Sequence, residues 1–273
     1  MSTESLRRGA YLCVSAPPEA AHELAPLAVA PLADRLGLQN EFFARDGHPS
    51  DAIAFLQRVD STVGTLADPT VADAAAAVHV ASNNADTVSE FCSAFERLLP
   101  SFARLRVLSG AVRPMRYTGG AMHEFAYARQ RVQQPAADMP NAFLLPLCKT
   151  PEWWTKDWME RHTYFLPRYD DRGRMVSEGH ALAASAGVPV LMRRTYACGD
   201  SPASNGGYDF LTYFECADAD VATFHAVCAA LRDVERNPEW RFVREGPTWR
   251  GRRRESWSAL WTASDTVPTT PAR

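Results

Sequence analysis

Short apolar runs alternate with amphipathic stretches along the first third of the chain. Glu19–Leu36 carries apolar residues at helical spacing and stops at Gly37, and Asp86–Leu99 has the same spacing and stops at Pro100. Both patterns predict helices, because a glycine or a proline commonly ends a helix. Three further runs have the length and apolar character of buried strands: Tyr11–Ser15, Ala77–Ala81 and Ala103–Leu108.

Residues 38–70 alternate poorly between apolar and polar positions and contain Gly47, Pro49 and Pro69. We interpret this segment as loops around a short helix at Asp51–Val59. The first half of the chain carries no recognisable catalytic or phosphate-binding motif, so its expected role is to complete the sheet.

The second half repeats the order of the first after a polar connector at Gln130–Pro140. Two successive β-α-β halves with segregated helices indicate an α+β fold of two ferredoxin-like subdomains. We place these at 1–137 and 138–255, followed by a tail at 256–273 that is expected to be disordered. The predicted elements of the second half are the strand Ala142–Leu147, the helix Gly173–Ala186, the strands Val188–Cys198 and Tyr208–Glu215, the helix Asp218–Val234 and a closing strand that starts at Trp240–Val243.

Charge and cysteine usage narrow the class of protein. The 273 residues carry 29 Lys and Arg against 32 Asp and Glu, a formal net charge of −3, which argues against a nucleic-acid partner. No apolar run approaches the roughly 18 to 20 residues that cross a bilayer, so no membrane partner is expected. The six cysteines form no C-x-x-C pair and are expected to be reduced thiols of a cytoplasmic protein.

His180 is the first candidate for chemistry, because small and apolar residues surround it on a predicted helix. A flat macrocycle needs such a wall, and its iron needs an axial nitrogen. Arg193 lies on the next predicted strand, which could return it to the other side of a bound disk. Taken singly, each residue has a plainer interpretation. A helical histidine is usually structural, a strand arginine is usually exposed, and the adjacent Trp153 and Trp154 are usually packing anchors.

Four motifs in order, over about residues 138 to 252, resemble the chlorite dismutase family. The combination is fairly specific for a divergent member of that family and less specific for the reaction. The motifs are the strand and K-x-x-x-W-W element at Asn141–Trp154, His180 together with Arg193–Tyr196, the strand Tyr208–Glu215, and the closing segment Arg244–Gly251.

The resemblance implies a chlorite-dismutase-like α+β barrel, made from the two ferredoxin-like subdomains, that binds heme b. By position, it implies that His180 is the proximal iron ligand and that Arg193 is the catalytic residue on the distal side. The implied reaction converts chlorite to chloride and dioxygen through a ferryl intermediate. The implied assembly is a homo-oligomer, commonly a pentamer.

The resemblance also implies residues that support the cofactor. Lys149, Trp153 and Trp154 would pack around the macrocycle on the proximal side. The family places a carboxylate behind the proximal histidine, which orients the imidazole and raises its basicity. A length difference after Val234 blurs that position, and Glu235 is the nearest carboxylate.

Departures from the family pattern leave the reaction open. Leu145 stands where coproheme decarboxylases carry a reactive tyrosine, and a leucine cannot form the tyrosyl radical, which disfavours that activity. The stretches 155–172 and 199–207 are longer than expected and flank the implied pocket. A specialised enzyme acting on an organic substrate by peroxidase, oxygenase or N–O chemistry is therefore one alternative, with His162, Tyr164 and Tyr169 as candidate contacts.

Three plainer alternatives remain. The stretch 155–172 could be a surface loop or an oligomer contact. The protein could bind heme without turning over a substrate. It could also be a cofactor-free barrel in which His180 and the two tryptophans only pack.

Overall fold

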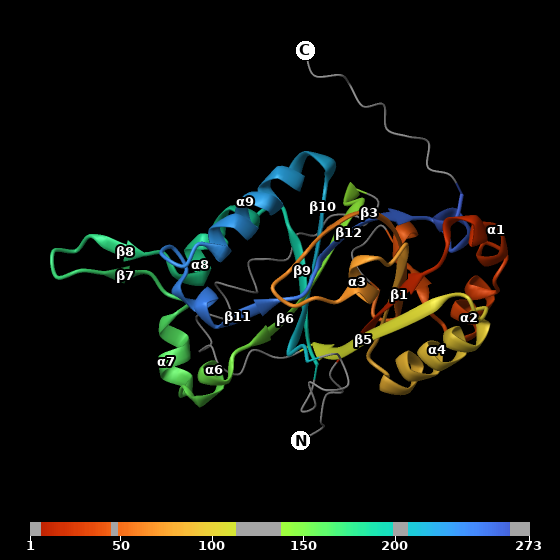
Figure 1. Cartoon of the computed structure of the whole chain (residues 1–273), viewed down its shortest axis with the longest axis horizontal. Coiled ribbons are helices and arrows are strands. Elements are labelled where there is room, and N and C mark those ends of the chain that lie inside the picture. Colours follow the sequence, from red (N-terminus) through yellow and green to blue (C-terminus); the bar gives the residue numbers. More distant parts are fainter. Residues whose placement is uncertain (1–6, 45–48, 113–137, 199–206, 263–273) are drawn as a thin grey trace, which may run out of the picture.

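A computed structural model describes residues 7–44, 49–112, 138–198 and 207–262. Helices lie on two opposite sides of a central barrel of strands (Figure 1). The main strands are β1 (Arg8–Ser15), β3 (Ala52–Thr62), β4 (Ala76–Ser82), β5 (Arg104–Val112), β6 (Asn141–Lys149), β9 (Met192–Ala197), β10 (Phe210–Cys216) and β12 (Thr248–Arg254). The short strands are β2 (Gln39–Asn40), β7 (Arg168–Tyr169), β8 (Met175–Ser177) and β11 (Val243–Glu245). The helices are α1 (Ala21–Leu24), α2 (Val29–Arg35), α3 (Pro69–Ala72), α4 (Ala85–Leu98), α6 (Pro151–Thr155), α7 (Trp158–Thr163), α8 (Gly179–Ala183) and α9 (Val221–Arg232).

The eight main strands close into one antiparallel barrel. The order runs β10-β9-β5-β1-β4-β3-β12-β6, and β6 pairs with β10 to complete the ring. The first half contributes the strands in the order β5-β1-β4-β3, and the second contributes β12-β6-β10-β9. Both orders are that of a ferredoxin-like β-α-β-β-α-β unit, so the predicted fold of two such units is confirmed.

Most predicted strands, and the helix at Asp86–Leu99, occur within a few residues of their expected bounds. The short helix predicted at Asp51–Val59 is wrong, because these residues belong to β3. β3 lies between β4 and β12, and its residues Ala52–Leu56 are buried, which gives a continuous apolar run. Periodicity alone cannot separate such a strand from a buried helix.

Three other predicted elements differ in extent. The helix predicted at Glu19–Leu36 is broken between α1 and α2, where Pro26 lacks a backbone N–H. The helix predicted at Gly173–Ala186 is helical only in its second half, as α8 and the start of a 3-10 helix at Ser185–Gly187, because β8 precedes them. The closing strand expected from Trp240–Val243 is preceded by a 3-10 helix, η8 (Pro238–Phe242), and the barrel closes with β12 instead.

The boundary connector and the tail are only partly described. The connector predicted at Gln130–Pro140 lies mainly outside the described residues. The tail predicted from residue 256 is described as far as residue 262, and there the expectation of disorder is corrected. Trp257 is 2% exposed, packs in the N-terminal core and donates a 2.7 Å hydrogen bond to the carbonyl of Leu24.

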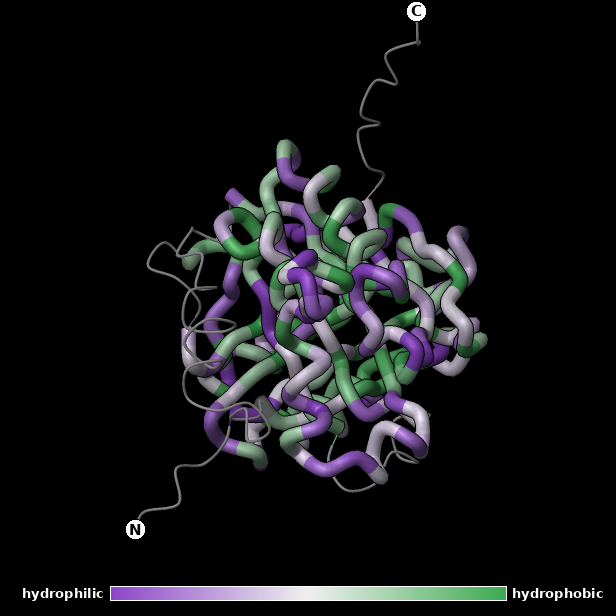
Figure 2. Tube along the Cα trace, turned by 90° about the vertical axis from the view of Figure 1, so that its left-hand side faces the viewer, coloured by the Kyte–Doolittle hydropathy of each residue, from purple (hydrophilic) through white to green (hydrophobic). Residues whose placement is uncertain are grey.

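Apolar side chains form three layers. One layer joins α2 and α4 to the outer face of the N-terminal strands, one fills the barrel, and one joins α8 and α9 to the outer face of the C-terminal strands. No helix in the described part of the chain is both long and apolar enough to span a membrane. Hydrophobic and hydrophilic segments instead alternate over short distances along the chain (Figure 2).

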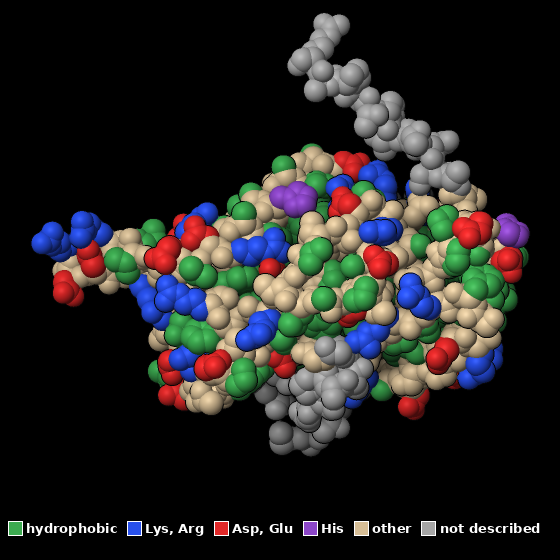
Figure 3. Space-filling model, viewed as in Figure 1, with side chains coloured by type: hydrophobic (Ala, Val, Ile, Leu, Met, Phe, Trp, Pro, Cys, Tyr) green, Lys and Arg blue, Asp and Glu red, His purple; other side chains and the backbone are tan. Residues whose placement is uncertain are grey.

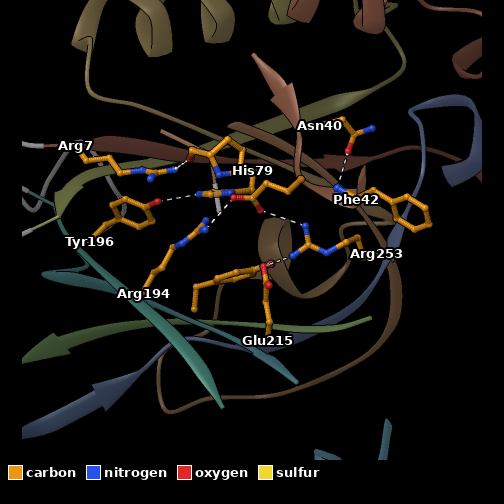
Figure 4. Close-up of polar contacts among 11 residues, drawn as sticks. Arg7, Asn40, Phe42, His79, Arg194, Tyr196, Glu215 and Arg253 are labelled. Carbon is orange, nitrogen blue, oxygen red and sulfur yellow. Dashed lines mark hydrogen bonds and ion pairs between the residues drawn. The ribbon is translucent and has the colours of Figure 1, made fainter. Parts of the chain in front are cut away.

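A network of charged residues lies inside the barrel beside the apolar layer (Figure 4). Glu41 accepts hydrogen bonds from Arg194 at 2.9 Å and from Arg253 at 3.2 Å, and Arg253 also pairs with Glu215. Glu41, Glu215 and Arg253 are buried, so each charge needs a partner of opposite sign to offset its lost hydration.

Buried rings complete this interior. His79 stacks on Tyr11 and on Tyr213, and its Nε2 lies 2.9 Å from the hydroxyl of Tyr196. Burial is the main cause that holds the pKa of His79 well below its ordinary value. This histidine is therefore a neutral part of the barrel interior.

Gly110→Ala should destabilise the protein at the seam where β5 meets β9. A Cβ at this position would lie 2.5 Å from the carbonyl oxygen of Ala197, a backbone atom of the facing strand. We expect a loss of about 1 to 3 kcal/mol in the free energy of unfolding, measured by urea titration. The exposed Arg104→Ala on the same strand should change it by less than about 0.5 kcal/mol. Equal stabilities of the Gly110→Ala variant and the parent would contradict the close contact between β5 and β9 at this position.

Candidate functional site

A pocket of about 810 Å³, its open mouth included, lies on the outer face of the C-terminal half. Strands β6, β9 and β10 form one wall, and α8, α9 and η8 contribute the others. Its lining includes the apolar Leu145, Leu147, Phe165, Phe210, Phe214 and Val243, and the polar Lys149, His180, Arg193, Thr195, Thr212 and Glu239.

Strand alternation decides which side chains face the pocket. Successive side chains of a strand point to opposite faces, so Arg193 and Thr195 of β9 line the pocket while Arg194 joins the network inside the barrel. On β10, Phe214 lies opposite Arg193, and Thr212 lies opposite Thr195. The strand wall therefore places a guanidinium, two hydroxyls and an aromatic ring side by side.

His180 is fixed by the backbone around it. Its N–H donates a 3.1 Å hydrogen bond to the carbonyl of Tyr164. Gly179, the residue before it, has φ +67, and a Cβ there would lie 2.4 Å from the carbonyl oxygen of Leu166. Only glycine suits both the conformation and the contact, so Gly179 sets where the short helix α8 begins.

The imidazole of His180 is held by a buried carboxylate. Its Nδ1 donates to Glu239 Oε2 at 2.7 Å, and Lys149 Nζ pairs with the other oxygen of the same carboxylate. Burial by itself would raise the pKa of Glu239, but the charges of Lys149 and His180 and the hydrogen bonds from both lower it to about 2. Because Glu239 occupies Nδ1, the lone pair for a metal is on Nε2.

The carboxylate that binds His180 is Glu239 and not the predicted Glu235. Glu235 is 84% exposed and pairs with Arg241 at 3.4 Å, away from His180. Glu239 lies four residues further on, in the 3-10 helix η8, which turns it towards Lys149 and His180. The length difference after Val234 obscures the alignment at this point, so no signal in the sequence singles out Glu239.

The predicted support residues pack next to the pocket. Lys149 lines the pocket and lies 4.2 Å from the ring centroid of the buried Trp153. Trp154 is 42% exposed and stacks at 6.2 Å on Phe210, which is also a lining residue. Neither tryptophan is among the lining residues, so each reaches the pocket through a neighbour.

The extra stretch 155–172 lies on the His180 side of the pocket. Tyr164 packs on Trp153 rather than entering the pocket, and neither it nor His162 is a lining residue. Tyr169 is 59% exposed on β7, in a hairpin with β8 that projects from the body and carries both charge signs near its tip (Figures 1 and 3). The pocket residue from this stretch is Phe165, whose ring centroid lies 5.2 Å from that of His180, and sequence reasoning missed it. Most of the second long loop, 199–207, is outside the described residues.

The residues present fit a heme. An apolar wall and an imidazole held through Nδ1 line one pocket, and these are the parts that an iron porphyrin needs from a protein. The guanidinium of Arg193 lines the same pocket. His180 would hold the iron, and the apolar lining would hold the macrocycle. All six cysteines are free thiols. Of these, Cys228 lines the pocket. It is buried, and burial raises the pKa of its thiol to about 11.

Known structures share this fold. No protein-family model matches the chain, and no curated protein matches it. A mutant of chlorite dismutase from Candidatus Nitrospira defluvii matches with a TM-score of 0.65 and 19% sequence identity, over 95% of this chain and 95% of that chain. The same protein in complex with imidazole matches with a TM-score of 0.64, 19% identity and the same coverage of both chains, 95%. At this identity the likeness shows the fold, and it confirms the predicted chlorite-dismutase-like barrel.

The buried carboxylate predicts an acid-sensitive stability. The pKa of Glu239 is lowered from 4.5 to about 2, so its contribution to stability is complete above about pH 5 and is lost as the pH falls towards 2. By pH 3 the native protein should lose about 2 kcal/mol of unfolding free energy from this group, measured by urea titration.

The double variant Lys149→Met, Glu239→Gln removes both charges and should lack this loss. The exposed Glu96→Gln should keep it. If the double variant loses as much stability at pH 3 as the parent, the loss does not come from Glu239, and Lys149 and His180 do not lower its pKa.

Proposed function

We propose that this chain, which has the fold of chlorite dismutases, is a heme-dependent oxidoreductase of that type. One observation carries the proposal: a carboxylate-held imidazole, His180, and a guanidinium, Arg193, line the same pocket. Simple carriage of heme does not require a permanent cation in the pocket. The same arrangement is unexplained in a barrel without a cofactor, where a pocket lined by His180 and Arg193 would have no use.

Heme b would supply a redox-active iron, and His180 would hold that iron through Nε2. Glu239 keeps the proton of His180 on Nδ1 and increases the electron donation of the ring. Lys149 shares the charge of Glu239, which keeps that carboxylate ionised in a buried place. Together these residues fix the tautomer, the orientation and the basicity of the ligand.

Arg193 would bind an anionic substrate in the same pocket. Its guanidinium is always charged and planar, so it can hold chlorite and retain the oxyanion formed when a chlorine–oxygen bond breaks. The overall change, ClO₂⁻ to Cl⁻ and O₂, needs no outside reductant. Thr195 and Thr212 lie next to Arg193 on the wall and can donate hydrogen bonds to the same anion.

The supporting assignments follow from the same proposal. Trp153 and Trp154 stabilise the heme site through Lys149 and Phe210. Leu145 lines the pocket and cannot form a radical, which speaks against coproheme decarboxylation. We also propose a homo-oligomer and a cytoplasmic location, the latter in keeping with six free thiols.

An organic substrate is the second candidate. A smaller, apolar pocket adjoins Arg193 and has no evident use for chlorite. The proposed contacts His162, Tyr164 and Tyr169 receive no support, because none of them lines either pocket.

His180→Ala should abolish specific heme binding. Purified protein supplied with heme should show a Soret band, and the variant should bind heme at least about 100-fold more weakly, because it lacks the axial ligand. The exposed His22→Ala should leave the titration unchanged. A parent protein that stays colourless with heme would leave only the cofactor-free alternative.

Arg193→Gln should separate binding of heme from turnover. The variant should keep the Soret band but release oxygen from chlorite with kcat/KM reduced by about 100-fold or more, followed with an oxygen electrode. The exposed Arg244→Gln is the matched control. If the heme-loaded parent releases no oxygen, the chlorite reaction is wrong and the organic-substrate candidate stands.

A further inference from the structure

A second pocket adjoins the first on the side of Arg193. It occupies about 320 Å³, its open mouth included, between α9 and the turn that follows α8. Apart from Arg193 and Phe214, the side chains that line it are aliphatic, and the backbone of Gly187 completes it. The aliphatic lining consists of Ala184, Val188, Leu191, Val227 and Leu231.

The two pockets share one wall. Arg193, Phe214 and Leu231 line both of them, so the guanidinium lies where the large pocket meets the small one. Arg193 is half-buried and is the one charged residue of the small pocket's lining. A molecule in the small pocket would therefore present one end to Arg193 and the rest to aliphatic side chains.

We propose that this small pocket binds the apolar tail of an organic anion whose charged head pairs with Arg193. The inference rests on the second candidate function given above, since it names the class of organic substrate for the same site. Chlorite has no apolar part and gains nothing from aliphatic walls, whereas each methylene buried there is favourable. Arginine is well suited to a carboxylate or another flat oxyanion, which it can bind through two hydrogen bonds.

The width of the pocket favours an unbranched tail. A Cβ on Gly187 would lie 2.7 Å from Leu191 Cδ1 and 3.2 Å from Val227 Cγ2, so these two side chains already fill the space beside Gly187 and leave no room there for a branch. A short linear chain needs less width than a branched or aromatic one. The ligand class is therefore a short, linear, monoanionic carboxylate or a compound of the same shape.

Calorimetric titration of the heme-loaded protein with acetate, butyrate, hexanoate and hexanol tests the proposal. Affinity should rise by about fourfold for each methylene until the pocket is full. Hexanoate should bind at least about tenfold more tightly than hexanol, because only hexanoate pairs with Arg193. In Arg193→Gln this preference for the anion should disappear, while the dependence on chain length remains.

Substitutions that fill the small pocket test the contribution of the apolar tail to binding. Ala184→Leu should flatten the dependence on chain length without changing the affinity for acetate. Ala186→Leu makes the same change at an exposed neighbour and should behave as the parent. Val188→Phe fills the pocket from another side and replaces Ala184→Leu if that variant fails to fold.

Equal affinities for acetate and hexanoate in the parent would overturn the proposal. So would a chain-length dependence that both filled variants retain. Failure of the proposed function is a separate result: if no Soret band forms, the same titration on heme-free protein still measures whether the small pocket takes a tail.

Discussion

A carboxylate buried between a lysine and an imidazole is the interaction on which the site depends. Glu239 is 4% exposed, and a charge so far from water is tolerable only because Lys149 and His180 both reach it. These three residues come from η8, β6 and α8, so one ion cluster joins three elements of the C-terminal half. The same contacts that stabilise the fold here also set the tautomer of the proposed iron ligand.

Polar side chains lie on both faces of the barrel wall: some line the pocket outside it, and others form the charged network inside it. Alternation along β9 directs Arg193 and Thr195 to the pocket and Arg194 into the barrel, where it pairs with Glu41. The interior network pairs Glu41 with Arg194 and Arg253, and Glu215 with Arg253, and the contact between His79 and Tyr196 links strands of both halves. On the pocket face, the guanidinium of Arg193 lines a surface that a ligand can reach. A shift of one residue in this strand would exchange the two sets.

Much of the fold could be predicted from the sequence, because β-α-β halves leave a clear order of apolar runs and helices. The buried strand β3 could not, since a strand buried on both faces shows no alternation. His180 and Arg193 were found through a motif, and the structure brings both to one pocket. Glu239 was missed because its position depends on the path of η8, which spacing along the chain does not reveal. Thr195, Thr212 and Phe165 carry no signal of their own until the register of the strands and the course of the 155–172 stretch are known.

A crystal structure of the heme-loaded protein would show whether His180 and Arg193 serve one cofactor. We expect a porphyrin in the large pocket, with iron bonded to His180 Nε2, Glu239 still bound to Nδ1, and the guanidinium of Arg193 over the opposite face. Iron bonded to another residue, or a porphyrin with His180 and Arg193 on the same side, would contradict this arrangement.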